Sequence, residues 1–469
     1  MVMYNTQTII AEVTPQGNCG VSILRISGKK VFNVMKEVLK KKLIPRYALF
    51  TKFLDIDLKT LDEGIAIWFP KPYSFTGEDV LELQGHGNPI LVNLLLKRIL
   101  KISGIRMAQP GEFSQRAFLN KKIDLTQAES IMDLISSSSV NSLKTSLNIL
   151  QGNFSKNIKK IFKEIKKFHI YLEGILNFPD DINNKNDIFL KKNFIIKIKN
   201  FIKILKKIYK FSKNNNYIKN GVKVIISGPP NSGKSSLFNK ITKKKLSIVT
   251  NLKGTTRDLI HEYVDFKGFL VEFIDTAGIR KAKNKIEKIG IKLAKKQIKK
   301  SDLLIFVIDS SKIEKKELKK YILFLKKNNV NITSFVVSNK IDLLKKHFRN
   351  NIKNKITKKN FVIDIIYTSV KNNIGLKTLK KYIIKIIKNN ISNSESEKFG
   401  LIRNRQIQEI KKILISFKKI KIFFKNNFIY YDLISEEVKT SLKHLNNILG
   451  KNVSNNVLKN IFSKFCVGK

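Results

Sequence analysis

The feature that most restricts the fold of this sequence is a strict alternation of apolar runs and helical segments after residue 221. The apolar runs have the length of strands, and a helical segment opens at Lys234, after the first of them. Parallel strands need a crossover connection, usually a helix, so this pattern predicts a parallel sheet covered by helices. The predicted strands are Val222–Ser227, Leu270–Ile274, Leu303–Asp309, Ser334–Ser338 and Val362–Thr368.

A phosphate-binding pattern, Gly-Pro-Pro-Asn-Ser-Gly-Lys-Ser, runs from Gly228 to Ser235, directly after the first predicted strand. Its glycines let backbone N–H groups converge on phosphate oxygens, and the start of the following helix adds a partial positive charge. We expect Lys234 to reach the β- and γ-phosphates and Ser235 to ligate Mg²⁺. Such a pattern can also be an ordinary structural turn, so its partners elsewhere in the chain decide the interpretation.

Four further elements lie at strand ends or between elements in the order that a guanine-nucleotide site requires. Asp275–Gly278 can hold a Mg²⁺-bound water and sense the γ-phosphate. The carboxylate that ends Asn339–Asp342 can accept two hydrogen bonds from guanine, which adenine does not offer. Gly254–Asp258 supplies Thr256 as a second hydroxyl for Mg²⁺, and Ser369–Lys371 fits a loop behind the base. Together these elements predict a GTPase.

Hydrolysis needs a positioned water and stabilisation of the charge that develops between the phosphates. Ras-like enzymes use a glutamine just after the Asp-x-x-Gly element, but Ile279 stands there in this chain. Glu287 is a candidate for that role, although composition alone favours a surface ion pair among lysines. Asn231 has the corresponding simple interpretation of a loop-shaping side chain.

The chain divides into four segments by pattern. Residues 1–120 predict a compact α/β domain, and residues 121–221 predict long amphipathic helices. Residues 222–385 hold the predicted GTPase domain, and the helical pattern resumes over residues 386–469. We predict one helical bundle built from both helical segments, with a Ras-like, doubly wound domain inserted between them. The expected elements of the first segment are strands at Thr8–Val13, Val21–Ser27, Gly64–Phe69 and Val80–Gln84 and a helix at Pro89–Lys101.

The formal net charge of +55 favours a polyanionic partner such as RNA. Lysine is spread beside asparagine and isoleucine throughout, so AT-biased coding is a competing explanation. The two cysteines, Cys19 and Cys466, have neither disulfide nor metal-ligand spacing, and the ending Cys-Val-Gly-Lys fits a prenylation box poorly. We expect a cytoplasmic protein, since neither a secretory signal nor a membrane-spanning run is visible.

Several stretches of the sequence carry a family resemblance. They are Val21–Gly28, Ser74–Gly87, Pro110–Asn120, the GTPase elements above and Phe465–Lys469. With these, the chain resembles the MnmE, or TrmE, family of tRNA-modification GTPases over nearly its full length. The resemblance implies an N-terminal α/β domain that dimerises and binds a 5-formyl- or 5,10-methylene-tetrahydrofolate, a central helical domain and an inserted GTPase domain.

The resemblance also implies a reaction and partners. The family works with the flavoprotein MnmG, or GidA, in a heterotetramer. It places an aminomethyl or carboxymethylaminomethyl group at C5 of the wobble uridine of certain tRNAs. Arg25, Glu82, Lys122 and Lys469 fall where the family contacts folate, and Cys466 matches a cysteine proposed to take part in modification. Arg25 could instead form a structural ion pair, and Cys466 could be a small buried thiol.

In the GTPase domain the resemblance implies that Asn231, Thr250, Leu252 and Thr255 surround K⁺ when two such domains meet. The ion would supply the charge that an arginine finger supplies elsewhere, and Glu287 would be the catalytic glutamate. The full set expected to contact GTP is Asn231, Ser232, Gly233, Lys234, Ser235, Ser236, Thr250, Asn251, Leu252, Lys253, Gly254, Thr255, Thr256, Asp275, Thr276, Ala277, Gly278, Asn339, Lys340, Asp342, Ser369, Val370 and Lys371.

Two segments of the sequence depart from the family pattern. Arg280–Lys285 is strongly basic where relatives are mixed or acidic, and Ser369–Lys371 reads Ser-Val-Lys instead of Ser-Ala-Lys.

Two other functions compete with this interpretation. A ribosome-assembly GTPase of the Era or Der type would share the nucleotide motifs and the basic surface but would lack the N-terminal and C-terminal sequence motifs. A membrane-surface GTPase has only the net charge in its favour.

Overall fold

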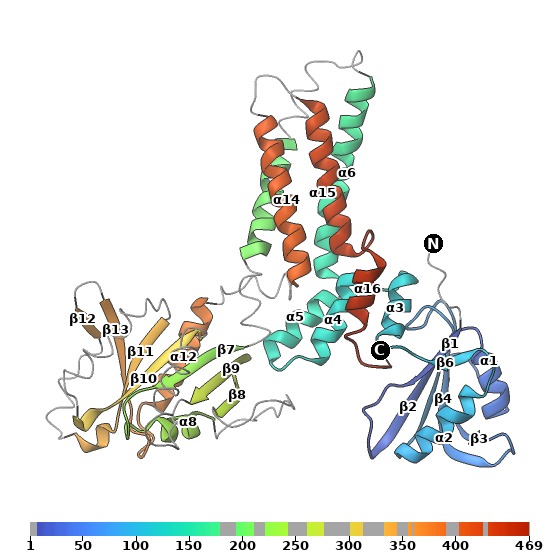
Figure 1. Cartoon of the computed structure of the whole chain (residues 1–469), viewed down its shortest axis with the longest axis horizontal. Coiled ribbons are helices and arrows are strands. Elements are labelled where there is room, and N and C mark those ends of the chain that lie inside the picture. Colours follow the sequence, from blue (N-terminus) through green and yellow to red (C-terminus); the bar gives the residue numbers. More distant parts are fainter. Residues whose placement is uncertain are drawn as a thin grey trace, which may run out of the picture. The chain divides into compact units, whose positions relative to one another are not determined.

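The structure is a computed structural model that describes two compact units of the chain (Figure 1). The first unit comprises Met1–Met132, Ile149–Ile202 and Gln408–Lys469, and the second comprises Asp133–Asn148 and Lys203–Ile407. Within them the described residues are 7–178, 194–210, 221–242, 260–275, 301–312, 333–344, 355–358, 361–390, 403–424 and 430–468.

The N-terminal part of the first unit is built on a six-stranded sheet in the order β3-β4-β5-β2-β1-β6. Neighbouring strands are antiparallel except β1 and β6, which are parallel. The predicted strands are present, and β3 and the short β6 were not predicted. The bounds are β1 Thr8–Glu12, β2 Cys19–Ser27, β3 Leu49–Leu54, β4 Thr60–Phe69, β5 Val80–Gly87 and β6 Ile105–Met107.

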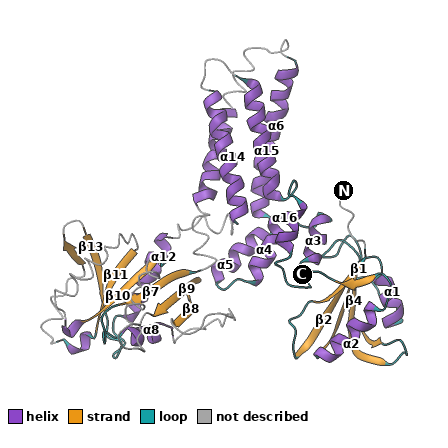
Figure 2. Ribbon diagram, viewed as in Figure 1, coloured by secondary structure: helices purple, strands orange, loops and turns teal. Residues whose placement is uncertain are grey.

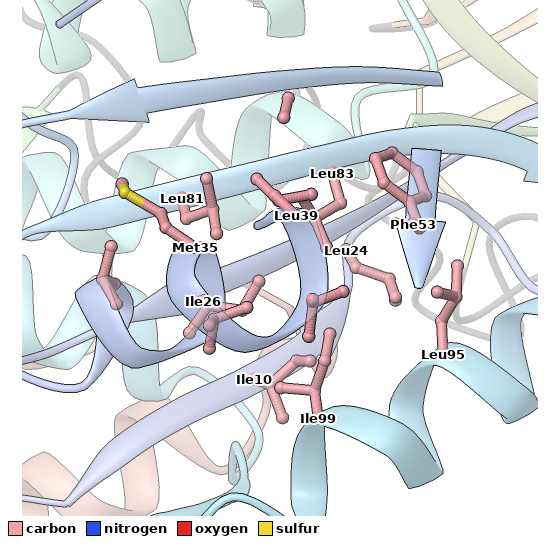
Figure 3. Packing of buried hydrophobic residues seen from close by; sticks show 14 of the residues in the cluster. Ile10, Leu24, Ile26, Met35, Leu39, Phe53, Leu81, Leu83, Leu95 and Ile99 are labelled. Atoms are coloured by element: carbon pink, nitrogen blue, oxygen red, sulfur yellow. The ribbon is translucent and has the colours of Figure 1, made fainter. Parts of the chain in front are cut away.

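One face of this sheet carries the core, because apolar residues at alternating positions of its strands are buried there. Figure 3 shows Leu24 and Ile26 of β2 beside Leu81 and Leu83 of β5. The covering elements are α1 Val31–Val34, the π-helical turn η1 Met35–Leu39 and α2 Pro89–Leu100. Asn88 caps α2 by accepting from the Ile90 amide, which satisfies one N–H group left over at the helix start.

The other face of the sheet is covered at one end by α3 Glu112–Leu119. Phe113 of α3 is buried with Ile9 and Ala11 of β1. Farther along this face, Phe50 of β3 and Ile65 of β4 are cross-strand partners and are 67% and 36% exposed. The sheet therefore presents apolar side chains to solvent on the same face that carries Arg25, since Arg25 pairs with Ala11 across β1 and β2.

Helices from both predicted helical segments pack in the first unit, as Figure 2 shows for α6, α14 and α15. Rings of Phe168, Phe194 and Phe424 form one aromatic cluster, and Ser435 donates to Glu173 at 2.8 Å between α15 and α6. Residues 194–210 are also helical. The labelled helices are α4 Leu125–Ile135, α5 Val140–Leu150, α6 Asn153–Asn177, α14 Asn404–Phe423, α15 Tyr431–Leu449 and α16 Asn455–Phe462.

The second unit contains a seven-stranded sheet in the order β12-β13-β11-β10-β7-β9-β8. Its five central strands are parallel, as predicted, but β8 and β12 pair antiparallel at the two edges, so the sheet is mixed. The strands are β7 Val222–Ser227, β8 Ile260–Phe266, β9 Phe269–Asp275, β10 Leu303–Asp309, β11 Thr333–Asn339, β12 Lys355–Lys358 and β13 Phe361–Tyr367, with helices α8 Lys234–Thr242 and α12 Leu376–Asn390.

The antiparallel edge strand β8 has a local cause. Lys267 and Gly268, at φ of 51° and 90°, form the two-residue connection between β8 and β9. Positive φ at both positions matches the twist of an antiparallel pair and is inexpensive for glycine. The carbonyl of Gly268 accepts a hydrogen bond from the Asn141 amide at 3.2 Å, so α5 begins against this turn.

None of the described helices is both long and apolar enough to cross a membrane. The same residues include no group of three or more His, Cys, Asp or Glu side chains placed to hold a metal ion.

Candidate nucleotide and cofactor sites

The predicted phosphate loop connects β7 to α8, and close packing fixes its shape. A Cβ on Gly228 would lie 2.1 Å from the carbonyl oxygen of Val307, and one on Gly233 would lie 2.3 Å from Nδ2 of Asn339. Both glycines have positive φ, and so does Asn231 at 61°. No other residue type fits at either glycine without moving its neighbours. The loop thus leads into the start of α8, whose first N–H groups lack partners within the helix.

Lys234, the cation of this loop, is buried at the first position of α8. Its Nζ donates a hydrogen bond of 2.6 Å to the carbonyl of Pro229, which also accepts from Ser232 Oγ at 2.9 Å. Ser235 and Ser236 follow on the first turn of α8 and are exposed. A phosphate oxygen can replace a backbone carbonyl as the partner of an ammonium group, with a stronger, charge-assisted bond.

Asn339 connects three loops of this site. Its Nδ2 donates to the carbonyl of Ser232 at 3.1 Å. Its Oδ1 accepts from the Val370 amide at 3.3 Å and from Thr368 Oγ1 at 3.3 Å. The carboxyl ends of parallel strands lie at one edge of the sheet, so the loops that follow β7, β11 and β13 lie close together. Asn339 therefore stabilises the phosphate loop as well as belonging to the predicted base-binding element.

Asp342, the predicted guanine partner, lies in the short helix η5 Ile341–Leu343 after β11. Ser369 Oγ donates to its Oδ1 at 2.5 Å, and the Asn372 amide donates to Ser369 Oγ at 3.2 Å. These bonds fix the carboxylate relative to the Ser369–Lys371 loop, within which Val370 is half-buried and Lys371 is exposed. An oriented carboxylate is suited to the two adjacent N–H donors of a guanine edge.

An ion pair that the sequence analysis missed links β10 to this site. Lys340 donates to the carbonyl of Asn231 at 2.6 Å and to Asp309 Oδ2 at 2.7 Å. Burial raises the pKa of Asp309, but hydrogen bonds from Lys340 and Ser311 outweigh burial and hold that pKa below its usual value. The available signal was position, because Asp309 ends a predicted strand, and Asp275 and Asn339 directly follow two others.

Several predicted residues lie outside the described residues, and Asp275 is described only as the last residue of β9. Its backbone pairs with Ile226 of β7 and Ile260 of β8. The residues outside are Thr250, Asn251, Leu252, Lys253, Gly254, Thr255, Thr256, Thr276, Ala277, Gly278, Glu287 and Lys469.

Two of the four predicted folate residues meet in the N-terminal domain. Arg25 of β2 and Glu82 of β5 are cross-strand partners, and Arg25 Nε donates to Glu82 Oε1 at 2.8 Å. The guanidinium group lies 5.4 Å from the ring centre of Phe75 and 5.9 Å from that of Phe113. Phe75 is 39% exposed. A flat heteroaromatic ring with polar edges fits this combination of exposed ring, cation and carboxylate.

Lys122 lies after α3 and contacts a different part of the loop before β5. Its Nζ lies 6.0 Å from the ring centre of Tyr73. Among the described residues it forms no hydrogen bond or ion pair with Arg25 or Glu82. The Lys122 ammonium group and the exposed Tyr73 ring thus lie at the loop that precedes β5, without a direct bond to the Arg25–Glu82 pair.

The C-terminal tail returns to the N-terminal domain. Gly468, at φ of 96°, packs so closely that a Cβ would lie 2.4 Å from the carbonyl oxygen of Glu12. The Gly111 amide donates to the carbonyl of Cys466 at 3.4 Å. Cys466 itself is a free, exposed thiol, not a buried one.

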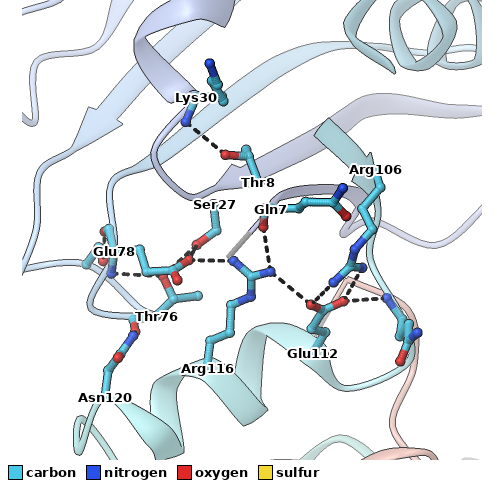
Figure 4. A network of polar contacts seen from close by, with 12 residues as sticks. Gln7, Thr8, Ser27, Lys30, Thr76, Glu78, Arg106, Glu112, Arg116 and Asn120 are labelled. Carbon is cyan, nitrogen blue, oxygen red and sulfur yellow. Dashed lines mark hydrogen bonds and ion pairs between the residues drawn. The ribbon is translucent and has the colours of Figure 1, made fainter. Parts of the chain in front are cut away.

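A partly buried polar network centres on Glu112 and Arg116 of α3 (Figure 4). Arg106 makes a two-point contact with Glu112, at 2.8 and 2.6 Å. Arg116 donates to Glu112 at 2.9 Å and to Glu78 at 2.9 Å, and Glu78 accepts from Ser27 at 2.7 Å. Burial would raise the pKa of Glu112, but hydrogen bonds from Arg106, the Gln109 amide and Arg116 lower it overall.

The chain is similar to known proteins over nearly its full length. Residues 8–122 match the family model "GTP-binding protein TrmE N-terminus", and residues 125–466 match "MnmE helical domain". Three curated relatives are each named "tRNA modification GTPase MnmE". That of Buchnera aphidicola subsp. Cinara cedri is 43% identical over 98% of this chain and 99% of its own. That of Buchnera aphidicola subsp. Baizongia pistaciae is 41% identical over 98% and 99%, and that of Proteus mirabilis is 38% identical over 100% of both chains.

Proposed function

Since this chain belongs to the MnmE family of tRNA modification GTPases and is a GTP-hydrolysing enzyme, we propose that it modifies the wobble uridine of certain tRNAs. With a flavoprotein partner of the MnmG type, in a heterotetramer, it adds an aminomethyl or carboxymethylaminomethyl group at C5. The observation that carries the proposal is the presence of two separate polar sites, one in each compact unit. A ribosome-assembly GTPase would need no second site in an N-terminal domain.

The Arg25–Glu82 face is the proposed folate site. Either Glu82 accepts hydrogen bonds from N–H groups of the pterin edge, or Arg25 pairs with a carboxylate of the folate. Phe75 offers a ring for stacking. Lys122 and Lys469 add positive charge toward the same ligand. Bound 5-formyl- or 5,10-methylene-tetrahydrofolate supplies the one-carbon unit. Cys466 is proposed to take part in the modification, and its exposure is compatible with that role.

The phosphate loop is the proposed site of GTP and its metal ions. Lys234 binds the β- and γ-phosphates, Ser235 and Thr256 hold Mg²⁺, and Asn231 with Thr250, Leu252 and Thr255 holds K⁺. These ions stabilise negative charge between the phosphates. Lys234 gains a charged partner in place of the Pro229 carbonyl, and Asp342 selects guanine. Glu287 positions the attacking water.

The exposed apolar face of the N-terminal sheet supports a homodimer through this domain. Phe50 and Ile65 pair across β3 and β4 on this face, and Gln84 of β5 and Ile23 of β2 continue the same row. A second copy would cover such a patch. Strong positive charge supports tRNA as the polyanionic substrate. We propose domain limits of 1–120, 121–221, 222–385 and 386–469.

Steady-state GTP hydrolysis in K⁺ and in Na⁺ at matched ionic strength tests the nucleotide part of this proposal. We expect hydrolysis to depend strongly on K⁺, and Asn231→Ala to lose that dependence. Titration of the full chain with 5-formyltetrahydrofolate tests the other part, with saturable binding expected. Equal rates in both salts together with no folate binding would favour a ribosome-assembly GTPase instead.

Glu287→Ala separates catalysis from binding. We expect GTP hydrolysis to be abolished while GTP affinity stays within roughly a few-fold of wild type, because a water-positioning group acts mainly in the transition state. A parallel loss of GTP binding would show that Glu287 is a structural residue.

A further inference from the structure

A cavity of about 470 Å³, lined mostly by charged and amide residues, lies in the N-terminal domain between α3 and the loop that precedes β5. Its walls include Lys29, Lys71, Gly77, Arg106, Arg116 and Asn120. None of these residues belongs to the predicted folate or nucleotide sets. Its volume is in the range of small-molecule sites.

The uncompensated charge in this cavity is positive. All three acidic residues of the lining already have partners: Glu112 and Glu78 bind arginines, and Asp79 accepts from the Lys71 amide at 3.2 Å. Lys29 and Lys71, in contrast, are exposed and form no ion pair with any described residue. A ligand in the cavity therefore finds two ammonium groups without a carboxylate partner, whereas the three carboxylates already accept from the protein.

The cavity adjoins the proposed folate site. A Cβ on Gly77, in the cavity wall, would lie 3.2 Å from Cγ of Lys122 and 3.1 Å from Cβ of Asn120. Ser27 lies two residues after Arg25 on the same face of β2, and it donates to Glu78 of the cavity wall. The Asn120 side chain donates to the carbonyl of Thr76 at 2.7 Å, which holds this loop against α3. The cavity is thus adjacent to Lys122 and to the part of β2 that carries Arg25.

We propose that this cavity binds the γ-linked glutamate chain of the folate, with Lys29 and Lys71 pairing with its α-carboxylates. The inference rests on the proposed folate site. Tetrahydrofolates end in a glutamate that can be extended through its γ-carboxyl group, and each added residue brings one more carboxylate. Such a chain can run from the Arg25 face past Gly77 and Asn120 into a cavity whose free charges are positive.

The charge pattern argues against a free amino acid as the ligand. The ammonium group of a zwitterion would need an acceptor carboxylate, and the carboxylates of the lining are engaged with Arg106, Arg116 and backbone amides. An RNA phosphate would also pair with Lys29 and Lys71, so the experiment separates the two anions.

The test compares the affinities of 5-formyltetrahydrofolate monoglutamate and triglutamate for the full chain. We expect the triglutamate to bind wild type roughly threefold to tenfold more tightly, as two partly exposed ion pairs would give. The double variant Lys29→Ala, Lys71→Ala should bring this ratio close to one and leave the monoglutamate affinity unchanged. A control double variant, Lys41→Ala, Lys59→Ala, makes the same charge change at exposed positions outside the cavity and should keep the wild-type ratio.

The outcomes distinguish this inference from the proposed function. Equal affinity of wild type for both folates, with clear monoglutamate binding, would overturn the cavity assignment and leave the folate site standing. Absence of binding of either folate to wild type would overturn both. A lysine variant that keeps the folate ratio but loses tRNA affinity would assign the cavity to an RNA phosphate instead.

Discussion

The proposed nucleotide site and the proposed N-terminal site differ in the partners of their positive charges. In the nucleotide site, Lys234 donates to a backbone carbonyl, and Lys340 divides its bonds between a carbonyl and one carboxylate. In the N-terminal domain, Arg25, Arg106 and Arg116 bind carboxylates directly.

This difference separates binding from stability. Exchanging a carbonyl for a phosphate strengthens the bond to Lys234, so that lysine contributes to the ligand complex more than to the fold. Breaking a buried arginine–carboxylate contact leaves a charge without its partner, so the contacts of Glu112 with Arg106 and Arg116 contribute mainly to the folded state. Arg25 differs from them, because it also faces the proposed folate site. Substitutions at the two sites should therefore have different readouts.

The largest expected effect is at Lys234. Lys234→Ala should lower kcat/KM for GTP by roughly 10²–10³-fold, the usual loss when one preorganised charge partner of a reacting group is removed. The melting temperature should stay near that of wild type, because Asn339 still holds the phosphate loop through the Ser232 carbonyl. Steady-state kinetics and thermal unfolding measure the two quantities. An unfolded variant would contradict the comparison.

Asp342 tests base selection. Asp342→Asn should lower GTP affinity roughly tenfold to a hundredfold, because a hydrogen bond to a charged group contributes about 1.5–3 kcal/mol. Xanthosine triphosphate has an oxygen acceptor at C2 in place of the amino donor of guanine. It should therefore bind better to the variant than to wild type. Equal loss of both nucleotides would mean that Asp342 acts through Ser369 and the loop shape alone.

Glu112 tests the N-terminal network. Glu112→Gln should lower the free energy of unfolding of this domain by about 1.5–3 kcal/mol, since Arg106 and Arg116 lose a charged acceptor. GTP hydrolysis should not change. Chemical denaturation followed by Trp68 fluorescence measures the change, because Trp68 lies in β4 of the same domain. A variant as stable as wild type would show that the network contributes no net stability.

Glu112 also predicts a pH dependence. Its pKa is lower in the folded chain than its ordinary value, so the stabilisation is complete above about 4.3, the unfolded pKa. It is lost as the pH falls through the lower, folded value. The N-terminal domain of wild type should thus lose stability on acidification over that interval. Glu112→Gln should lose less, and parallel curves for the two proteins would refute this source of the effect.

The smallest expected effect is at Asp309. Asp309→Asn removes a partly exposed ion pair with Lys340, so stability should fall by about 1 kcal/mol or less. GTP affinity should change roughly twofold to threefold, because Lys340 keeps its bond to the Asn231 carbonyl. Nucleotide titration measures this, and a loss as large as that of Asp342→Asn would place Asp309 in direct contact with the ligand.

More of the local structure could be predicted around the phosphate loop than in the N-terminal polar network, because of where the residues lie in the chain. The phosphate loop is contiguous and follows a strand, so pattern alone located Lys234 and the glycines. The Asp309–Lys340 pair depends on β10 and β11 being neighbours, which strand order decides and periodicity does not show.

In the N-terminal domain, the Glu112–Arg116 contact has helical spacing and was readable in principle. Arg106 stands on the three-residue strand β6, too short to be recognised from alternation, so its contact with Glu112 could not be foreseen. The edge strand β8 was missed although Lys267-Gly268 is a turn signal, because the expectation of a parallel sheet left no place for a hairpin.

The most direct test of two separate ligand sites is equilibrium binding of 5-formyltetrahydrofolate and of GTP to Arg25→Ala and Lys234→Ala side by side. The account predicts that Arg25→Ala loses folate binding and keeps GTP binding, while Lys234→Ala keeps folate binding and weakens GTP binding. Folate affinity unchanged in Arg25→Ala, or lost in Lys234→Ala, would contradict it.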